Sequence, residues 1–213
     1  MKREYWIAIG AGLGLVALLA ILSLVPGPDR TGDSVVVFGD SITEFGEGHL
    51  GLELGSTYGL IVDGDFGARV GDRVQPAAQH ADADQVIVNL GTNDVVVGTP
   101  LDKVRLAMDA LLDELSDVEC VHVVTVSENL LSDGVLLPDA GREVNRMIAA
   151  AASGRPNVDL LHWDRIQQAA ALRRGDPQAL TFDGIHPDDD GLRVLAESYD
   201  GVLADCGRPW FLP

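Results

Sequence analysis

The sequence predicts an α/β domain in which a parallel β-sheet is covered by helices on both faces. Five short apolar runs alternate with longer stretches of helical periodicity, and this alternation is typical of parallel strands joined by crossover helices. The clearest run is continuously apolar rather than alternating with polar residues, which indicates a strand buried on both faces. The chain has 213 residues, which is enough for one domain with a full core.

The elements follow one another from residue 34 onward. The continuously apolar run SVVVF predicts a strand over residues 34–38. Four more strands are predicted at 58–64, 84–91, 119–126 and 157–163. Helices are predicted over 101–115, 138–153 and 188–206. The first of these helices places five apolar side chains on one face: Val104, Met108, Leu111, Leu112 and Leu115. Three aspartates, Asp188, Asp189 and Asp190, begin the last helix, where they suit its dipole, so we interpret them as structural.

The N-terminal region predicts a membrane anchor. Trp6 to Val25 is a stretch of 20 residues without a charge, and at about 1.5 Å per residue it spans roughly 30 Å, the thickness of a bilayer's hydrocarbon core. Lys2 and Arg3 precede it, which favours a cytoplasmic N-terminus at residues 1–5. A Pro/Gly-rich linker at 26–33 would join this anchor to a domain at 34–213 that is extracytoplasmic. The alternative is a cleaved signal peptide, which would leave a secreted protein.

Charge and cysteine content narrow the classes of partner. The formal net charge is −18 and the basic residues form no clustered stripe, so nucleic acid is excluded as a partner.

The two cysteines, Cys120 and Cys206, should both lie on the face opposite the strand-end site. An outward-facing domain would permit a disulfide between them, but two buried thiols remain equally compatible with the sequence. The sequence does not indicate an oligomeric state.

Polar side chains gather where the predicted strands end. Gly39-Asp40-Ser41 follows the first strand, and a loop containing Gly67 and Gly71 follows the second. The GTND segment, which contains Asn93, follows the third strand, and TFDGIHP, with Asp183 and His186, precedes the last helix. Ligands in such folds bind outside the carboxyl ends of the strands, so we expect these segments to converge on one rim.

Together these segments contain the groups needed for acyl transfer by a serine nucleophile. A serine hydroxyl requires a base within hydrogen-bonding distance, usually histidine, and that histidine requires an acceptor on its other ring nitrogen. Asp183 lies three residues before His186 and could fold back to accept this bond. Asn93 and backbone N–H groups of glycine-containing loops could stabilise the oxyanion, where one donor contributes roughly 3–4 kcal/mol.

Two local patterns suggest other interpretations of the region after the first strand. Ser41-x-x-Glu44 matches a capping box, in which both side chains satisfy N–H groups at a helix start. GEGHLG, Gly46 to Gly51, matches the dinucleotide-binding pattern G-x-G-x-x-G. Too few residues follow Gly51 for the helix that a dinucleotide site requires, so we interpret these glycines as a flexible loop beside the pocket.

The remaining polar residues near strand ends have structural interpretations. His122 lies inside an apolar run and should be a core residue, whereas His162 could either line the site or be structural. Asp40 and Asp94 should shape their turns, and Asn145 should be structural. The sequence contains no HExxH, CxxC or P-loop pattern, so no metal ion or nucleotide cofactor is implied.

Four segments resemble the four sequence blocks of the SGNH, or GDSL-like, hydrolases. They are FGDSITE, the glycine of ARVGDR, GTND and DGIHP, in this order across nearly all of the soluble domain. The resemblance implies Ser41 as nucleophile, His186 as base and Asp183 as the residue that orients the histidine. It implies the Ser41 and Gly71 N–H groups and the Asn93 side chain as oxyanion donors, although Gly67 lies close to Gly71. It also implies a flavodoxin-like three-layer α/β/α sandwich.

GTND, Val144-Asn145 and HWD are similar to the SGNH domains of membrane acyltransferases that O-acetylate polysaccharides. Those chains carry a many-helix membrane domain, which a single predicted span does not supply. We therefore expect a membrane-anchored serine esterase or lipase that hydrolyses small-molecule, lipid or acylated carbohydrate esters through an acyl-enzyme. An O-acetyltransferase or acetylesterase of cell-envelope polysaccharide and a non-catalytic binding domain are the alternatives.

Overall fold

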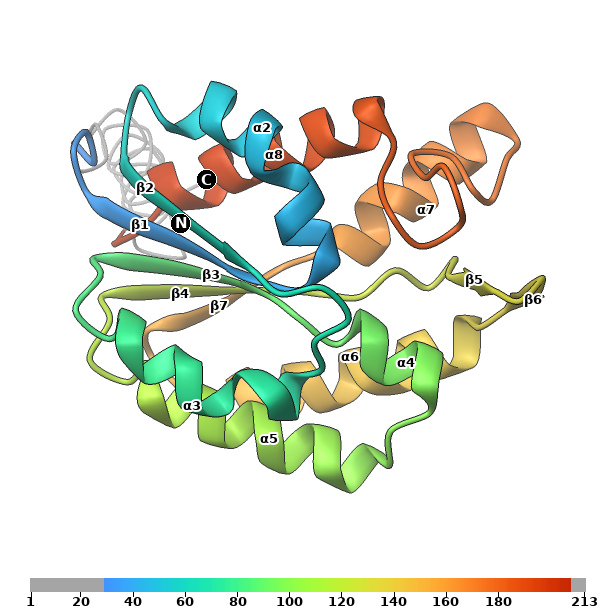
Figure 1. Cartoon of the computed structure of the whole chain (residues 1–213), viewed down its shortest axis with the longest axis horizontal. Coiled ribbons are helices and arrows are strands. Elements are labelled where there is room, and N and C mark those ends of the chain that lie inside the picture. Colours follow the sequence, from blue (N-terminus) through green and yellow to red (C-terminus); the bar gives the residue numbers. More distant parts are fainter. Residues whose placement is uncertain (1–28, 208–213) are drawn as a thin grey trace, which may run out of the picture. The chain divides into compact units, whose positions relative to one another are not determined.

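The computed structural model describes residues 29–207, of which Arg30–Cys206 form one compact unit. A sheet of five parallel strands runs through this unit in the order β2-β1-β3-β4-β7 (Figure 1). The strands are β1 (Ser34–Gly39), β2 (Gly59–Gly64), β3 (Gln85–Asn89), β4 (Cys120–Val124) and β7 (Val158–Leu161). This confirms the predicted five-stranded parallel sheet. Its strand order is that of doubly wound sheets, whose ligands bind at the carboxyl ends of the strands beside the point where the order reverses.

Helices cover both faces of the sheet, as the alternating pattern predicts (Figure 1). One face carries α2 (Ser41–Leu54), α7 (Trp163–Arg174) and α8 (Asp189–Ala204). The other face carries the 3₁₀ helix η1 (Val70–Arg73), α3 (Val74–Ala77), the 3₁₀ helix η2 (Ala78–His80), α4 (Thr92–Val97), α5 (Leu101–Glu114) and α6 (Pro138–Ala152). Asp188 is the N-cap of α8 and accepts a hydrogen bond from the Gly191 N–H at 2.8 Å, so its structural interpretation is confirmed.

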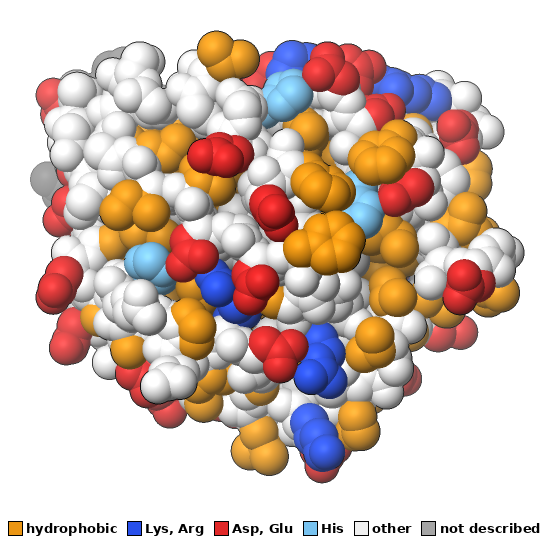
Figure 2. All heavy atoms as spheres, viewed as in Figure 1, with side chains coloured by type: hydrophobic (Ala, Val, Ile, Leu, Met, Phe, Trp, Pro, Cys, Tyr) orange, Lys and Arg blue, Asp and Glu red, His pale blue; other side chains and the backbone are white. Residues whose placement is uncertain are grey.

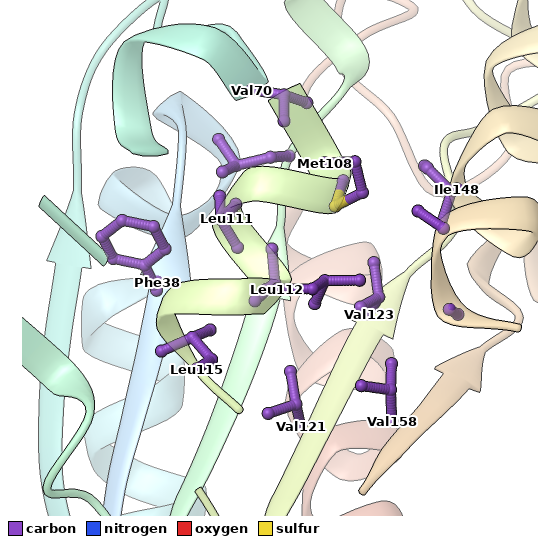
Figure 3. Close-up of a cluster of buried hydrophobic side chains, with 14 of the residues drawn as sticks. Phe38, Val70, Met108, Leu111, Leu112, Leu115, Val121, Val123, Ile148 and Val158 are labelled. Carbon is purple, nitrogen blue, oxygen red and sulfur yellow. The ribbon is translucent and has the colours of Figure 1, made fainter. Parts of the chain in front are cut away.

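The two faces of the sheet bury separate apolar clusters because successive strand residues point to opposite sides. Val36 and Phe38 of β1 belong to the cluster with α5 and α6, whereas Val35 and Val37 belong to the cluster with α2 and α8. Figure 3 shows the first cluster, in which Met108 of α5 lies among side chains from the sheet and from α6. A sheet buried in this way holds the ends of its strands in fixed relative positions, which the site at those ends requires.

The segment after β1 differs from the sequence prediction. Gly46–Gly51 was expected to form a flexible loop, but α2 runs through all of these residues. Ile42, Leu50 and Leu54 lie on one face of α2 and are buried against the sheet. Their burial outweighs the cost of about 1 kcal/mol per glycine inside a helix.

A small hairpin was not predicted. It consists of β5 (Leu131–Ser132) and β6 (Val135–Leu136), which pair in antiparallel orientation. The turn residues Asp133 and Gly134 both have positive φ, 49° and 76°. Two left-handed residues are typical of a type I′ turn, for which Asp-Gly is a preferred pair, so the sequence contains a usable signal for this hairpin.

At the other end of the sheet, Cys120 and Cys206 form a disulfide. This bond joins the start of β4 to the residues that follow α8, and it decides between the two alternatives that the sequence leaves open. The predicted cytoplasmic segment 1–5 and membrane anchor 6–25 lie outside the described residues. Within residues 29–207, no helix has both the length and the apolar character needed to cross a membrane.

Candidate active site

The first site residue, Ser41, lies where β1 turns sharply into α2. β1 ends at Gly39, where an added Cβ would overlap the Thr43 side chain and lie 2.6 Å from the Asn89 carbonyl oxygen, so only glycine fits. Asp40 is the N-cap of α2 and accepts a hydrogen bond from the Ile42 N–H at 3.0 Å. Ser41 is therefore the first residue of the helix rather than its cap.

The capping box of Ser41 and Glu44, which the sequence leaves open, does not form for this reason. Because the Asp40 carboxylate takes the capping position, the Ser41 hydroxyl does not bond to the helix N-terminus and is available to another partner. That partner is His186, whose Nε2 lies 2.9 Å from Ser41 Oγ.

His186 is held by Asp183. The His186 Nδ1 lies 2.7 Å from Asp183 Oδ2, while Asp183 Oδ1 accepts hydrogen bonds from the backbone N–H groups of Ile185 at 2.9 Å and His186 at 2.7 Å. Burial acts to raise the pKa of Asp183, but these hydrogen bonds outweigh it and hold the pKa below its ordinary value. An ionised carboxylate can only accept, so Nδ1 carries the proton and Nε2 presents a lone pair to the serine hydroxyl.

The loop that carries Asp183 and His186 rests on the β5–β6 hairpin. The Leu131 N–H donates to the Gly184 carbonyl oxygen at 3.0 Å. Gly184 has φ +88°, and an added Cβ there would collide with the Leu131 side chain. The Phe182 N–H donates to the His186 carbonyl oxygen at 3.1 Å and closes the loop on itself. The hairpin that the sequence did not predict thus supports the position of the histidine.

Asn93, in α4, is brought next to the turn that presents Ser41. Its Nδ2 donates to the Ala68 carbonyl oxygen at 3.0 Å and to Asp40 Oδ2 at 3.3 Å. Both hydrogens of the amide are therefore engaged, and the longer bond to Asp40 is the weaker of the two by geometry. This N–H is the one that could turn toward a bound substrate.

The two glycines after β2 lie in different surroundings. Gly71 is in η1, faces Ala107 of α5, and lines a cavity of about 340 Å³ with Asp94 and Lys103 among its walls. Gly67 has φ +75° in a turn closed by a hydrogen bond from the Ala68 N–H to the Asp65 carbonyl oxygen at 3.1 Å. Because Asn93 bonds to Ala68, the described contacts connect the Gly67 turn, rather than Gly71, to the Asn93 amide.

Asp40 and Asp94 are buried carboxylates that shape turns, as expected. Asp94 accepts a hydrogen bond from the Val70 N–H at 3.0 Å, and burial raises its pKa. Asp40 is fully buried, and burial raises its pKa to about 7 even though the Ile42 N–H and the nearby His186 act in the opposite direction.

The remaining predictions for polar residues have clear outcomes. His122 in β4 is a buried core residue, as predicted, and burial lowers its pKa to about 4. Asn145 is structural, because its amide group bonds to both the N–H and the carbonyl of Val126, at 2.7 and 2.8 Å. His162 follows β7 and lies 3.5 Å from Asp164, beside a cavity next to α6, and no described contact joins it to Ser41.

Two phenylalanines flank His186, and a third lies against one of them. The rings of Phe45 and Phe182 lie 5.0 and 5.8 Å from the imidazole, centre to centre, and Phe66 lies 6.0 Å from Phe45. Figure 2 shows apolar side chains gathered around a histidine on the face near α2 and the loop before α8. Nothing in the sequence around these phenylalanines indicates that their rings are exposed. Only the structure therefore reveals the cluster.

The chain is similar to known proteins in sequence and in fold. Residues 37–194 match the sequence model of the GDSL-like Lipase/Acylhydrolase family. No curated protein matches the chain. Among solved structures, the chain is similar to the acetyl xylan esterase AlAXEase with 25% identity and a TM-score of 0.68, covering 79% of this chain and 98% of that one.

Two further solved structures have the same fold. One is the acetylxylan esterase Axe2 from Geobacillus stearothermophilus, with 20% identity, a TM-score of 0.65, and coverage of 85% of this chain and 97% of that one. The other is the lipase/acylhydrolase from Enterococcus faecalis, with 16% identity, a TM-score of 0.67, and coverage of 81% and 95%.

Proposed function

The chain belongs to the GDSL-like lipase/acylhydrolase family and is an ester-hydrolysing enzyme, and we propose that Ser41, His186 and Asp183 carry out the hydrolysis. The observation that carries the proposal is the continuous chain from Ser41 Oγ to His186 Nε2, at 2.9 Å, and from His186 Nδ1 to Asp183 Oδ2, at 2.7 Å. These distances are within the range that proton transfer from a serine nucleophile requires.

In the proposed reaction, Ser41 Oγ attacks the ester carbonyl carbon while His186 Nε2 takes the hydroxyl proton. The tetrahedral intermediate collapses, and His186 returns the proton to the oxygen of the departing alcohol. This leaves an acyl group on Ser41. Water then attacks the acyl-enzyme with the same base, which releases the carboxylic acid and restores the serine. Ionised Asp183 stabilises the imidazolium that forms in each half of the reaction.

Three donors are proposed for the oxyanion. The Ser41 N–H is one of the first N–H groups of α2, which have no partner within the helix. The Asn93 Nδ2 supplies a second donor after its weak bond to Asp40 is exchanged for the oxyanion. For the third donor we propose the Gly67 N–H in place of Gly71, because the Gly67 turn is bonded to Asn93 and Gly71 faces α5.

The proposed substrate is an uncharged ester with a short acyl group. The 25% identity of this chain to an acetyl xylan esterase supports an acetyl ester of a carbohydrate as the substrate. An O-acetyltransferase would need an acyl acceptor, such as a sugar hydroxyl, in place of water, and a non-catalytic binding domain would not react covalently. In the experiment below, labelling of Ser41 without hydrolysis of any ester would favour the transferase, and absence of labelling would favour the binding domain.

The experiment combines covalent labelling with a substrate series. The full chain should react with a fluorophosphonate at Ser41, and Ser41→Ala should abolish both labelling and hydrolysis. With p-nitrophenyl esters of increasing acyl length, kcat/KM should be highest for acetate. Absence of labelling in a folded chain would contradict the serine mechanism. Rapid labelling with a preference for long acyl chains would replace the short-chain substrate by a lipid ester.

We also propose that the domain is extracytoplasmic and anchored by residues 6–25. The Cys120–Cys206 disulfide supports an oxidising compartment. In cells, the chain should remain in the membrane fraction after alkaline extraction and should be cleaved by protease added from outside. Release into the medium of a shortened chain would favour signal cleavage instead.

A further inference from the structure

Three exposed phenylalanines form an apolar cluster beside the proposed base. Phe45, Phe66 and Phe182 are 45%, 67% and 66% exposed. They come from α2, from the turn after β2 and from the loop before α8, which are far apart in the sequence. Single exposed apolar residues need no explanation, but several large ones that lie together indicate a surface that binds a ligand or another molecule.

The position of the cluster identifies which part of a substrate it would contact. In the proposed reaction, His186 returns the proton to the oxygen of the departing alcohol, so that oxygen must come within hydrogen-bonding distance of the imidazole. The carbon atoms attached to the oxygen then lie against the residues that flank the imidazole. Phe45 flanks it at 5.0 Å, and Phe182 lies nearly parallel to it at 5.8 Å with an interplanar angle of 18°.

We propose that Phe45, Phe66 and Phe182 form the binding site for the alcohol part of the ester, and that this part is an uncharged group with a flat apolar face. The inference rests on the proposed function, because it uses His186 as the group that protonates the alcohol. An aryl ring and the C–H face of a sugar ring share the required chemistry, since both stack on aromatic side chains.

The charges near the cluster disfavour an anionic alcohol. Each phenylalanine has a carboxylate as its sequence neighbour: Glu44 before Phe45, Asp65 before Phe66 and Asp183 after Phe182. The Asp65 carboxylate lies 3.6 Å from Arg73, whereas Asp183 is directed to His186. A phosphorylated alcohol such as a lipid headgroup would bring negative charge toward these carboxylates and would be repelled.

The test compares acetate esters that differ only in the alcohol. Methyl acetate, benzyl acetate and a mono-acetylated methyl xyloside are hydrolysed by the full chain and by Phe45→Ala, Phe182→Ala and Phe182→Leu. Leu172→Ala is the matched control, because Leu172 is 80% exposed on α7, away from the contacts described for the site. Dividing each variant's kcat/KM by that of the wild type cancels the intrinsic reactivity of each ester.

For the two alanine variants, the fall in kcat/KM should be about fivefold greater for a ring-containing ester than for methyl acetate, mainly through KM. Phe182→Leu should show part of this difference, and Leu172→Ala should show none. A difference with benzyl acetate alone assigns the site to aryl alcohols, and one with the xyloside assigns it to sugars. An equal fall on all three esters overturns this inference alone. If the wild type hydrolyses no ester, the proposed function and the inference both fail.

Discussion

The buried carboxyl group of Asp40 should make the stability of the protein depend on pH near neutrality. Burial raises the pKa of Asp40 from 3.8 to about 7, so the folded chain binds this proton more tightly than the unfolded chain does. The stabilisation that follows is complete below about pH 4 and is lost as the pH rises through about 7. At 1.36 kcal/mol per pKa unit it amounts to about 4 kcal/mol, of which about 3 kcal/mol falls between pH 5 and pH 8.

Asp40→Asn removes this titration and keeps the size of the side chain. Its oxygen can still accept from the Ile42 N–H, but its amide then faces the Asn93 Nδ2, which is also a donor. One donor is left unpaired at a cost of about 1–3 kcal/mol at every pH. The variant should therefore be less stable than the wild type at pH 5. Between pH 5 and pH 8, the unfolding free energy of the variant minus that of the wild type should rise by about 3 kcal/mol.

The measurement is urea denaturation at pH 5, 6, 7 and 8, followed by tryptophan fluorescence, to which the buried Trp163, only 4% exposed, contributes. Asp84→Asn is the control. Hydrogen bonds from Ser34 lower the pKa of Asp84, so its carboxylate stays ionised in both states above pH 5 and the variant should differ from the wild type by a constant. If the Asp40→Asn difference is also constant to within about 1 kcal/mol, the raised pKa is refuted.

Four further predictions concern the disulfide, two glycines and Asp183. Replacing Cys120 and Cys206 by alanine opens a link between positions 86 residues apart and should lower the unfolding free energy by about 4–5 kcal/mol, measured in urea; an unchanged midpoint would contradict it. Gly141→Ala places a Cβ 2.7 Å from a backbone carbonyl oxygen and should destabilise by about 1–3 kcal/mol. Gly48→Ala, on an open part of α2, should stabilise by about 0.5–1 kcal/mol, and thermal unfolding should give the two opposite signs. Asp183→Asn should lower kcat by about 10³–10⁴-fold with little change in KM, because the imidazole would lose its tautomer; a loss below about tenfold would argue against that role.

The sheet was predictable from the sequence because its burial leaves a direct trace in the pattern. A parallel strand covered on both faces must be apolar at successive positions, and β1 carries Val35, Val36, Val37 and Phe38 without interruption. The strand order then brings the carboxyl ends of β1 and β3 side by side. Segments that follow these strands must meet, which is why spacing along the chain was enough to bring Ser41 and Asn93 to one rim.

The course of α2 was not predictable in the same way. Glycine lowers helix propensity, and Gly46, Gly48 and Gly51 together favour a loop. The competing signal is weaker in the sequence because glycines and polar residues interrupt the apolar positions Ile42, Leu50 and Leu54. Only the surface against which they pack, formed in part by α8, decides that the helix persists.

Backbone direction accounts for the uncertainty between Gly67 and Gly71. Both glycines follow β2 within one short segment, and spacing places them equally near the rim. The chain turns at Gly67, which has φ +75°, and continues into η1. Gly71 therefore faces α5, while Ala68 lies beside Asn93. Spacing along the sequence cannot predict a change of backbone direction within four residues, so it cannot distinguish Gly67 from Gly71.

Asp40 links the helix start to the proposed chemistry and explains why Ser41 is not the cap. Through Oδ1 it satisfies the Ile42 N–H, and through Oδ2 it holds the Asn93 amide. A serine in the capping position would have its hydroxyl committed to the helix, and it would be a poorer partner for a base. Because an aspartate stands one residue earlier, α2 begins with a free hydroxyl at its first position, next to N–H groups that the helix itself leaves unpaired. The same carboxylate engages the Asn93 N–H, and in the proposed reaction an oxyanion competes for that N–H. Substituting Asp40 should therefore lower kcat as well as change the pH dependence of stability, and a variant that altered stability alone would separate the two roles.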